Sequence, residues 1–289
     1  ITVGGTGKTP LVAWLSNYFS ERDVMIAVLT RGYKIDKSDF ADEPVLLAKL
    51  CPKAKIVISP DRFEGAQKAI AEFGAKLLIM DDGFQHRRLA RDVNIVTIDA
   101  TNPFGCEKLL PAGFLREPVN SLKRADAVVV THSNQVSQEK IQEIKARISG
   151  INPNILFATA VHKPCCAKLI KDETVSLAQL AKKKLYAFCG IGNPDAFFKT
   201  LDELALNIVG TRVYNDHHGY TALDIETIAS EAKYKQAEMI ITTQKDWLKT
   251  ALLCMEKFDI PIAFLAVGLE FADGQQEITT LIDKAIKII

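Results

Sequence analysis

Short apolar runs alternate with amphipathic stretches along the first half of the chain. The apolar runs are continuous and rich in β-branched residues, which is typical of strands covered on both faces of a parallel sheet. The stretches between them carry apolar residues at helical spacing. We expect strands at residues 24–29, 55–59, 75–80, 94–98 and 127–130, and helices at residues 10–19, 44–50, 62–73 and 137–148.

A second alternating series fills the rest of the chain. Strands are predicted at residues 184–189 and 207–214, helices at 195–204 and 224–233, and the alternation continues through 239–242, 247–255, 262–267 and 277–288. Residues 160–174 fit neither series, so we place a domain boundary there. The pattern predicts an α/β protein with a doubly wound parallel sheet in residues 1–163 and a second, smaller α/β domain in residues 164–289.

Composition and charge exclude only a few functions. The chain of 289 residues is 48% hydrophobic with a formal charge of +1, so we expect a globular protein without the global basic field that binds nucleic acid non-specifically. It has no apolar run long enough to span a bilayer. The six cysteines form no Cys-x-x-Cys pair, which favours core-filling thiols in a reducing, cytoplasmic compartment over zinc or disulfides.

The chain opens on a glycine-rich segment between an apolar start and a predicted helix. It consists of Thr2, Val3, Gly4, Gly5, Thr6, Gly7, Lys8 and Thr9. Glycines allow backbone N–H groups to turn inward around phosphate oxygens. We expect Lys8 to reach the β- and γ-phosphates of a nucleotide and the Thr9 hydroxyl to coordinate Mg²⁺. Although Thr2 stands where the strict P-loop pattern has glycine, Gly-Lys-Thr at a helix start predicts a P-loop NTPase core. Because the apolar start of the segment is typical of the interior of a buried strand, we also expect residues before Ile1.

Further polar segments follow predicted strands or interrupt the pattern. An apolar strand ends in Asp81 and Asp82, and such a strand lies beside the P-loop strand in many NTPases, where its Asp holds the metal or its water. The other segments are Thr-Arg-Gly-Tyr at residues 30–33, Ala-Asp-Glu-Pro at 41–44, Leu-Pro-Ala-Gly-Phe-Leu-Arg-Glu-Pro at 110–118 and Asn-Asp-His-His-Gly at 215–219. Adjacent histidines on a strand point to opposite faces and rarely share one ion, so we favour acid–base or phosphate-contact chemistry for the last segment.

In this order, these motifs closely resemble those of the tetraacyldisaccharide 4'-kinase family, the lipid A 4'-kinases of Gram-negative bacteria. The resemblance runs from Ile1 to at least Lys249, and Asp-Asp-Gly-Phe-Gln-His at residues 81–86 and Leu-Pro-Ala-Gly-Phe-Leu-Arg-Glu at 110–117 are close to diagnostic. It implies transfer of the ATP γ-phosphate to the 4'-hydroxyl of a tetraacylated glucosamine disaccharide 1-phosphate. It also implies a two-lobed molecule and peripheral contact with the cytoplasmic side of the bacterial inner membrane, with an N-terminal membrane-associated helix that we expect to lie before Ile1. No nucleic acid and no obligate protein partner are expected.

The resemblance assigns roles to individual residues. Asp81 and Asp82 match the metal-site carboxylates, with Asp82 as the preferred metal ligand. Asp42, assisted by His217, matches the base that acts on the sugar hydroxyl. The remaining matches, which we expect to position the lipid headgroup, are Arg31, Tyr33, Arg116 and Glu117. The chain departs from the family in a shorter connection before Asp42 and in Gln244, which replaces the usual Glu.

Two other functions fit the phosphate loop. One is a P-loop kinase of a soluble metabolite, which differs in its acceptor. The other is a nucleotide-switch ATPase that binds a protein partner, but such proteins usually carry Lys where Val3 stands.

Overall fold

The computed structural model describes residues 1–2, 6–31, 42–169, 173–216, 218–250, 253 and 259–287, and of residues 42, 43 and 287 the backbone alone. Contacts divide the chain into two compact units. Unit 1 comprises residues 1–34, 50–163 and 268–289, and unit 2 comprises residues 35–49 and 164–267. Two long strands, β6 (Leu156–Leu169) and β11 (Ile262–Asp273), continue from one unit into the other. The predicted domain bounds, 1–163 and 164–289, stay a prediction.

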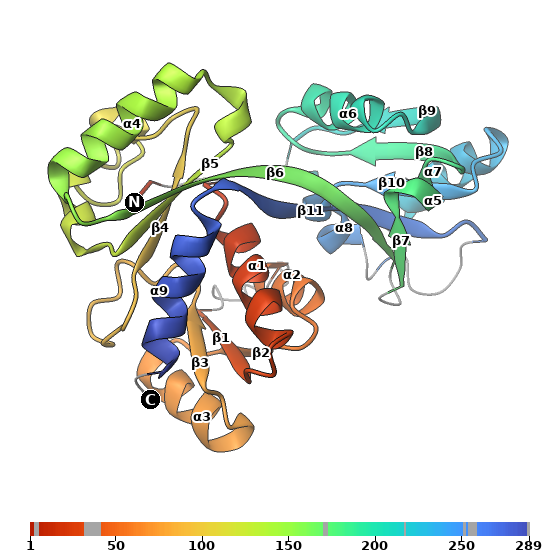
Figure 1. The fold of residues 1–289 in the computed structure, drawn as a ribbon. Coiled ribbons are helices and arrows are strands. Elements are labelled where there is room, and N and C mark those ends of the chain that lie inside the picture. Colours follow the sequence, from red (N-terminus) through yellow and green to blue (C-terminus); the bar gives the residue numbers. More distant parts are fainter. Residues whose placement is uncertain are drawn as a thin grey trace. The chain divides into compact units, whose positions relative to one another are not determined.

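Unit 1 is built on parallel strands (Figure 1). One sheet has the order β2-β1-β3, and in the other the order is β4-β5-β6 with β11 next. The strands are β1 (Ile26–Thr30), β2 (Lys55–Ile58), β3 (Leu77–Met80), β4 (Ile95–Asp99) and β5 (Ala127–Thr131). The helices are α1 (Lys8–Ser20), α3 (Arg62–Phe73), α4 (Gln138–Ile151), α9 (Gln275–Lys287) and the short η1 (Gly105–Glu107), η2 (Val119–Arg124) and η3 (Ser133–Gln135).

Strand β5 shows why its residues 127–130 are all apolar. Val128 and Val130 lie in a core with Ile141, Ile144 and Ile148 of α4. The alternate residues Ala127 and Val129 lie in another core, with α1 and α9. Since both faces of the strand are covered by helices, it has no polar face, as expected for a doubly wound parallel sheet.

Unit 2 repeats the same arrangement on a smaller scale. Its strands follow the order β11-β10-β8-β9 and are parallel where the register is described, and β7 pairs with β6 in antiparallel fashion. Helix α6 packs on one face and α7 on the other. The elements are α2 (Asp42–Leu50, of which Leu50 belongs to unit 1), β7 (Thr174–Ser176), α5 (Leu177–Leu180), β8 (Lys184–Cys189), α6 (Pro194–Glu203), β9 (Asn207–Val213), α7 (Ala222–Tyr234), β10 (Met239–Thr242) and α8 (Gln244–Thr250).

The predicted α/β class is confirmed, and most predicted elements agree with the structure within about two residues. The exceptions are α8, which begins at Gln244 rather than residue 247, β11, which runs to Asp273 rather than residue 267, and β6. For β6, no regular element was predicted in residues 160–174, where the strand runs to Leu169. Pro164 interrupts its apolar run, and a proline argues against a strand interior. The cysteine prediction holds for buried Cys51 and Cys189 but not for Cys106 and Cys165, which are exposed.

Candidate active site

The phosphate loop ends at the start of α1. Gly7 is the N-cap with φ 83°, and within the described residues no side chain caps the helix and no acidic residue lies in its first turn. The positive end of the helix and Lys8, its first residue, therefore favour an anion. Thr9 follows, half-buried. Thr2 is buried and forms an isolated bridge with Leu115, whereas Val3, Gly4 and Gly5 lie outside the described residues.

Asp82 joins the phosphate-loop helix to the segment at residues 110–118. Its carboxylate lies 3.9 Å from Lys8 Nζ and accepts a hydrogen bond of 2.5 Å from the Arg116 guanidinium. Asp82 has φ 51° directly after β3, and its side chain is 31% exposed, whereas Asp81 is 2% exposed. Of the two acidic residues, Asp82 is the one that solvent and ligands reach.

Two arginines act electrostatically around the acidic pair. Arg62, the first residue of α3, is buried and donates to the Ser59 carbonyl oxygen at 2.8 Å. Burial lowers the pKa of Arg62 and so does the charge of Arg31, whereas Asp81 and Asp82 raise it. The charge of the predicted Arg31 thus acts on Arg62, which also interacts with Asp81 and Asp82. Arg62 itself was not among the predicted site residues. Tyr33 lies outside the described residues.

Glu117 is engaged with its own surroundings. Burial raises the pKa of Glu117, but the hydrogen bond and charge of Arg124 and the hydrogen bonds of Ser121 and Gln85 outweigh it, so the pKa is lowered. Arg124 donates to Glu117 Oε2 at 2.7 Å, and its guanidinium lies 4.5 Å from the ring centroid of Phe84. These contacts tie the two most family-specific segments together and leave Arg116 directed at Asp82.

A cavity of about 530 Å³ in unit 1 connects these groups. Lys8, Asp81, Asp82 and Arg116 line its polar part, and apolar residues of β3, β4, α1 and α9 line the remainder. Lys8 of α1, the carboxylates Asp81 and Asp82 after β3, and Arg116 therefore share one space, whereas Thr9 does not line it.

The predicted proton-accepting residues belong to unit 2. Asp42 is the first residue of α2, but its side chain lies outside the described part of the chain, as does all of His217. His218 Nε2 lies 3.2 Å from Asp224 Oδ2, and its ring stacks on Tyr214. Asp216 lies 3.2 Å from Lys245 Nζ.

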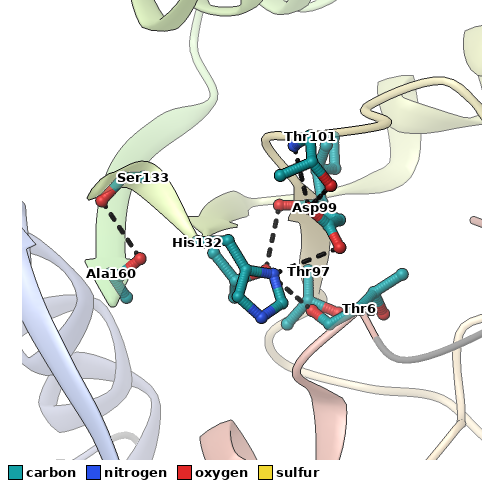
Figure 2. Close-up of polar contacts among 9 residues, drawn as sticks. Thr6, Thr97, Asp99, Thr101, His132, Ser133 and Ala160 are labelled. Atoms are coloured by element: carbon teal, nitrogen blue, oxygen red, sulfur yellow. Dashed lines mark hydrogen bonds and ion pairs between the residues drawn. The ribbon is translucent and has the colours of Figure 1, made fainter. Parts of the chain in front are cut away.

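A cluster at the ends of β4 and β5 was not predicted. Thr6 Oγ1 lies 3.0 Å from Thr97 Oγ1, and His132 Nδ1 lies 3.2 Å from Asp99 Oδ2 (Figure 2). Asp99 also accepts hydrogen bonds from the backbone and hydroxyl of Thr101. The carboxyl ends of parallel strands bind ligands in such folds, and Asp99 and His132 directly follow the strands expected from the sequence, so their position was a usable signal.

No cluster of three or more His, Cys, Asp or Glu side chains suited to a metal ion occurs within the described residues. A magnesium ion bound with a nucleotide needs only one or two carboxylates, because phosphate oxygens and water complete its shell. Asp82 and Asp81 fit that requirement. In the described parts of the chain, no helix combines the length and apolar character needed to cross a membrane.

Comparisons with known proteins lead to the same family as the motifs. The family profile of Tetraacyldisaccharide-1-P 4'-kinase (LpxK) matches residues 1–287. Tetraacyldisaccharide 4'-kinase of Halothermothrix orenii is 34% identical over 314 residues, which cover 98% of this chain and 82% of the relative. The enzyme of Syntrophus aciditrophicus is 38% identical over 294 residues, 93% of this chain and 78% of the relative. The crystal structure of "apo" form LpxK from Aquifex aeolicus in complex with ATP is similar with a TM-score of 0.74 and 28% identity, covering 98% of this chain and 85% of that one.

Proposed function

The chain belongs to the tetraacyldisaccharide-1-P 4'-kinase family, as its motifs suggested, and from this premise we propose how its own residues carry the reaction. It is a phosphotransferase that moves the γ-phosphate of ATP to the 4'-hydroxyl of tetraacyldisaccharide 1-phosphate. The bond between the γ-phosphorus and the ADP oxygen breaks, and a bond to the 4'-oxygen forms. The hydroxyl proton must pass to a base as this bond forms.

The donor side lies at the start of α1. The phosphates of ATP bind the loop formed by residues 2–9, the uncapped N–H groups of α1 stabilise their negative charge, and Lys8 contacts the β- and γ-phosphates. Thr9 and Asp82 would hold Mg²⁺, which would supply charge neutralisation on the phosphate oxygens. The burial of Asp81 beside the charge of Arg62 favours Asp82 over Asp81 for direct contact with the metal.

The acceptor side uses the residues that match the family's acceptor motifs. Asp42 accepts the proton of the 4'-hydroxyl with assistance from His217. Arg31, Tyr33 and Arg116 position the phosphorylated headgroup, since a guanidinium forms paired hydrogen bonds with phosphate. Glu117 acts on this segment through Arg124, whose side chain it holds.

The substrate also implies a location. A tetraacylated disaccharide resides in a bilayer, so we place the enzyme peripherally on the cytoplasmic side of the bacterial inner membrane, where ATP is available.

One observation carries the assignment of the donor site: Asp82 contacts both Lys8 of the phosphate-loop helix and Arg116 of the Leu-Pro-Ala-Gly-Phe-Leu-Arg-Glu segment. The test is a kinase assay with ATP, Mg²⁺ and tetraacyldisaccharide 1-phosphate. Asp82→Asn should lower kcat by about 100-fold or more and Asp81→Asn by less, because a metal ligand stabilises the transition state directly. Equal loss in both variants would contradict the choice of Asp82.

The proton-transfer assignment has its own variant. Asp42→Asn should lower kcat by about 100-fold with the KM for ATP changed less than about threefold, since general-base catalysis supplies that order of acceleration. Near-normal turnover of Asp42→Asn would remove Asp42 from the mechanism while leaving the family assignment intact.

A further inference from the structure

Thr6 of the phosphate loop is held by side chains from the sheet of unit 1. Thr6 Oγ1 lies 3.0 Å from Thr97 Oγ1 of β4, as Figure 2 shows. Thr131 Oγ1 of β5 donates to the Thr6 carbonyl oxygen at 3.1 Å. Thr6, Thr97 and Thr131 are all buried. The loop end is therefore anchored to two neighbouring strands before α1 begins.

A third strand, β6, reaches the loop through His162. A Cβ built on Gly7 would lie 2.8 Å from His162 Nε2 and 2.8 Å from Thr131 Cγ2, closer than any real side chain allows. Gly7 also has φ 83°, a conformation that glycine adopts without strain. The edge of the imidazole thus lies directly against the backbone of Gly7.

The state of the His162 ring is fixed by its surroundings. Burial and, next, the charge of the neighbouring His132 lower the pKa of His162, and although Asp99 raises it, the net value is about 4, so the ring is neutral near pH 7. The ring meets that of His132 edge to face, with centroids 4.4 Å apart, and His132 Nδ1 is 3.2 Å from Asp99. Within the described residues, His162 Nε2 has no hydrogen-bond partner. One nitrogen therefore faces the loop and remains available to it.

We propose that His162 is a positioning residue for the phosphate loop, and that the Asp99–His132 pair sets the orientation of its ring. This inference rests on the proposed ATP site at residues 2–9. The imidazole limits the movement of Gly7 and, through it, of the first N–H groups of α1, which receive the phosphates. Loss of the ring should weaken productive ATP binding and leave the binding of the lipid unchanged.

The test measures KM for ATP, KM for the lipid and kcat separately, together with the melting temperature. His162→Ala should raise the KM for ATP by about tenfold, because small misplacements of binding groups cost that much or more. His162→Gln, which keeps a polar group of similar reach, should restore it to within about threefold of wild type. The KM for the lipid should stay within about twofold in both variants.

Val161→Ala is the matched control. Val161 is the preceding residue of β6, is buried, and points to the opposite face of the strand, so its truncation costs stability without touching the loop. A KM for ATP that rises equally in Val161→Ala and His162→Ala would overturn the proposal, as would an unchanged value in a folded His162→Ala. If His162→Ala does not fold, Asp99→Ala serves instead, and an unchanged KM for ATP there contradicts the role of the pair.

Lys8→Ala separates this inference from the assignment of the loop. Full activity in Lys8→Ala would remove the proposed ATP site and the inference with it. Loss of activity in Lys8→Ala together with normal ATP kinetics in His162→Ala would leave the site intact and overturn only the role of His162.

Discussion

Each unit contains a histidine–aspartate pair with the same nitrogen–oxygen distance of 3.2 Å, and the two pairs differ in the residues that they contact next. In unit 1, His132 Nδ1 is 3.2 Å from Asp99 Oδ2, and the His132 ring contacts His162, which lies against Gly7. In unit 2, His218 Nε2 is 3.2 Å from Asp224 Oδ2, and the His218 ring stacks on Tyr214 at a centroid distance of 4.5 Å.

The partner of each aspartate explains the difference. Asp224 belongs to the capping box of α7, where its carboxylate accepts hydrogen bonds from the backbone and hydroxyl of Thr221. That is a structural task, and His218 adds to it. Asp99 also forms a local turn with Thr101, but its second oxygen lies 3.2 Å from Nδ1 of His132, whose ring meets that of His162 beside the phosphate loop. The same pair of residue types thus stabilises a helix end in one unit and supports a ligand site in the other.

The largest expected difference in activity is between variants of two glycines, Gly7 against His162 in unit 1 and Gly219 next to His218 in unit 2. Gly7→Ala should lower kcat/KM for ATP by about 100-fold, because its Cβ would meet His162 and Thr131 at 2.8 Å and Gly7 has a positive φ. A Cβ on Gly219, next to His218, would meet none of the described atoms within 4 Å. Gly219→Ala should change kcat/KM by less than about threefold.

Steady-state kinetics and a melting curve for both glycine variants make the check. Gly150→Ala in α4 provides the stability control, since its Cβ also meets none of the described atoms within 4 Å and alanine favours a helix. Comparable losses of activity in Gly7→Ala and Gly219→Ala would show that close packing at the loop is not what distinguishes the two regions.

A smaller contrast is expected from the aspartates. Asp224→Ala should lower the free energy of unfolding by about 1 kcal/mol, the usual contribution of a cap, and leave the KM for ATP unchanged. Asp99→Ala should raise the KM for ATP by about threefold to tenfold, because the His132 and His162 rings lose their anchor. Urea unfolding and ATP kinetics on both variants test this. A raised KM for ATP in Asp224→Ala alone would reverse the roles assigned to the pairs.

The contrast also shows what the sequence could reveal. Asp99 and His132 follow predicted strands whose carboxyl ends meet at one edge, so strand order alone would have brought them together. His162 could not be found this way, because it lies in a segment whose mixed pattern and Pro164 hid the strand β6. In the sequence, Arg62 is an ordinary first residue of a predicted helix, and only the folded chain places its charge near Asp81.

Three predicted site residues, one each for phosphate contact, metal binding and headgroup binding, illustrate the reverse case. Lys8, Asp82 and Arg116 were found from motifs, and the structure brings them together in one cavity although they come from separate elements. The contacts of Glu117 could not be read from its motif, because Arg124 lies in the next helical segment, η2. Motifs therefore indicated residues that the fold places side by side, and packing decided which neighbours contact them.

The smallest expected effect is a difference between the two regions in how their contribution to stability depends on pH. The pKa of His162 is lowered from its ordinary value of 6.5 to about 4, so below pH 6.5 the unfolded chain binds a proton that the folded chain does not. Stability should therefore fall as the pH drops from 6.5 to 4 and change no further through this group below that.

The pKa of Asp224 is lowered, chiefly by the backbone hydrogen bond of Thr221, so its contribution to stability is present above its ordinary value of 3.8 and is lost as the pH falls below that value. Melting temperatures at pH 7, 5 and 3 test both signs. His162→Gln should show a smaller decrease than wild type between pH 7 and 5, and Asp224→Ala should match wild type there and differ only in the step to pH 3. An identical decrease for wild type and His162→Gln between pH 7 and 5 would mean that His162 is not held neutral beside the phosphate loop.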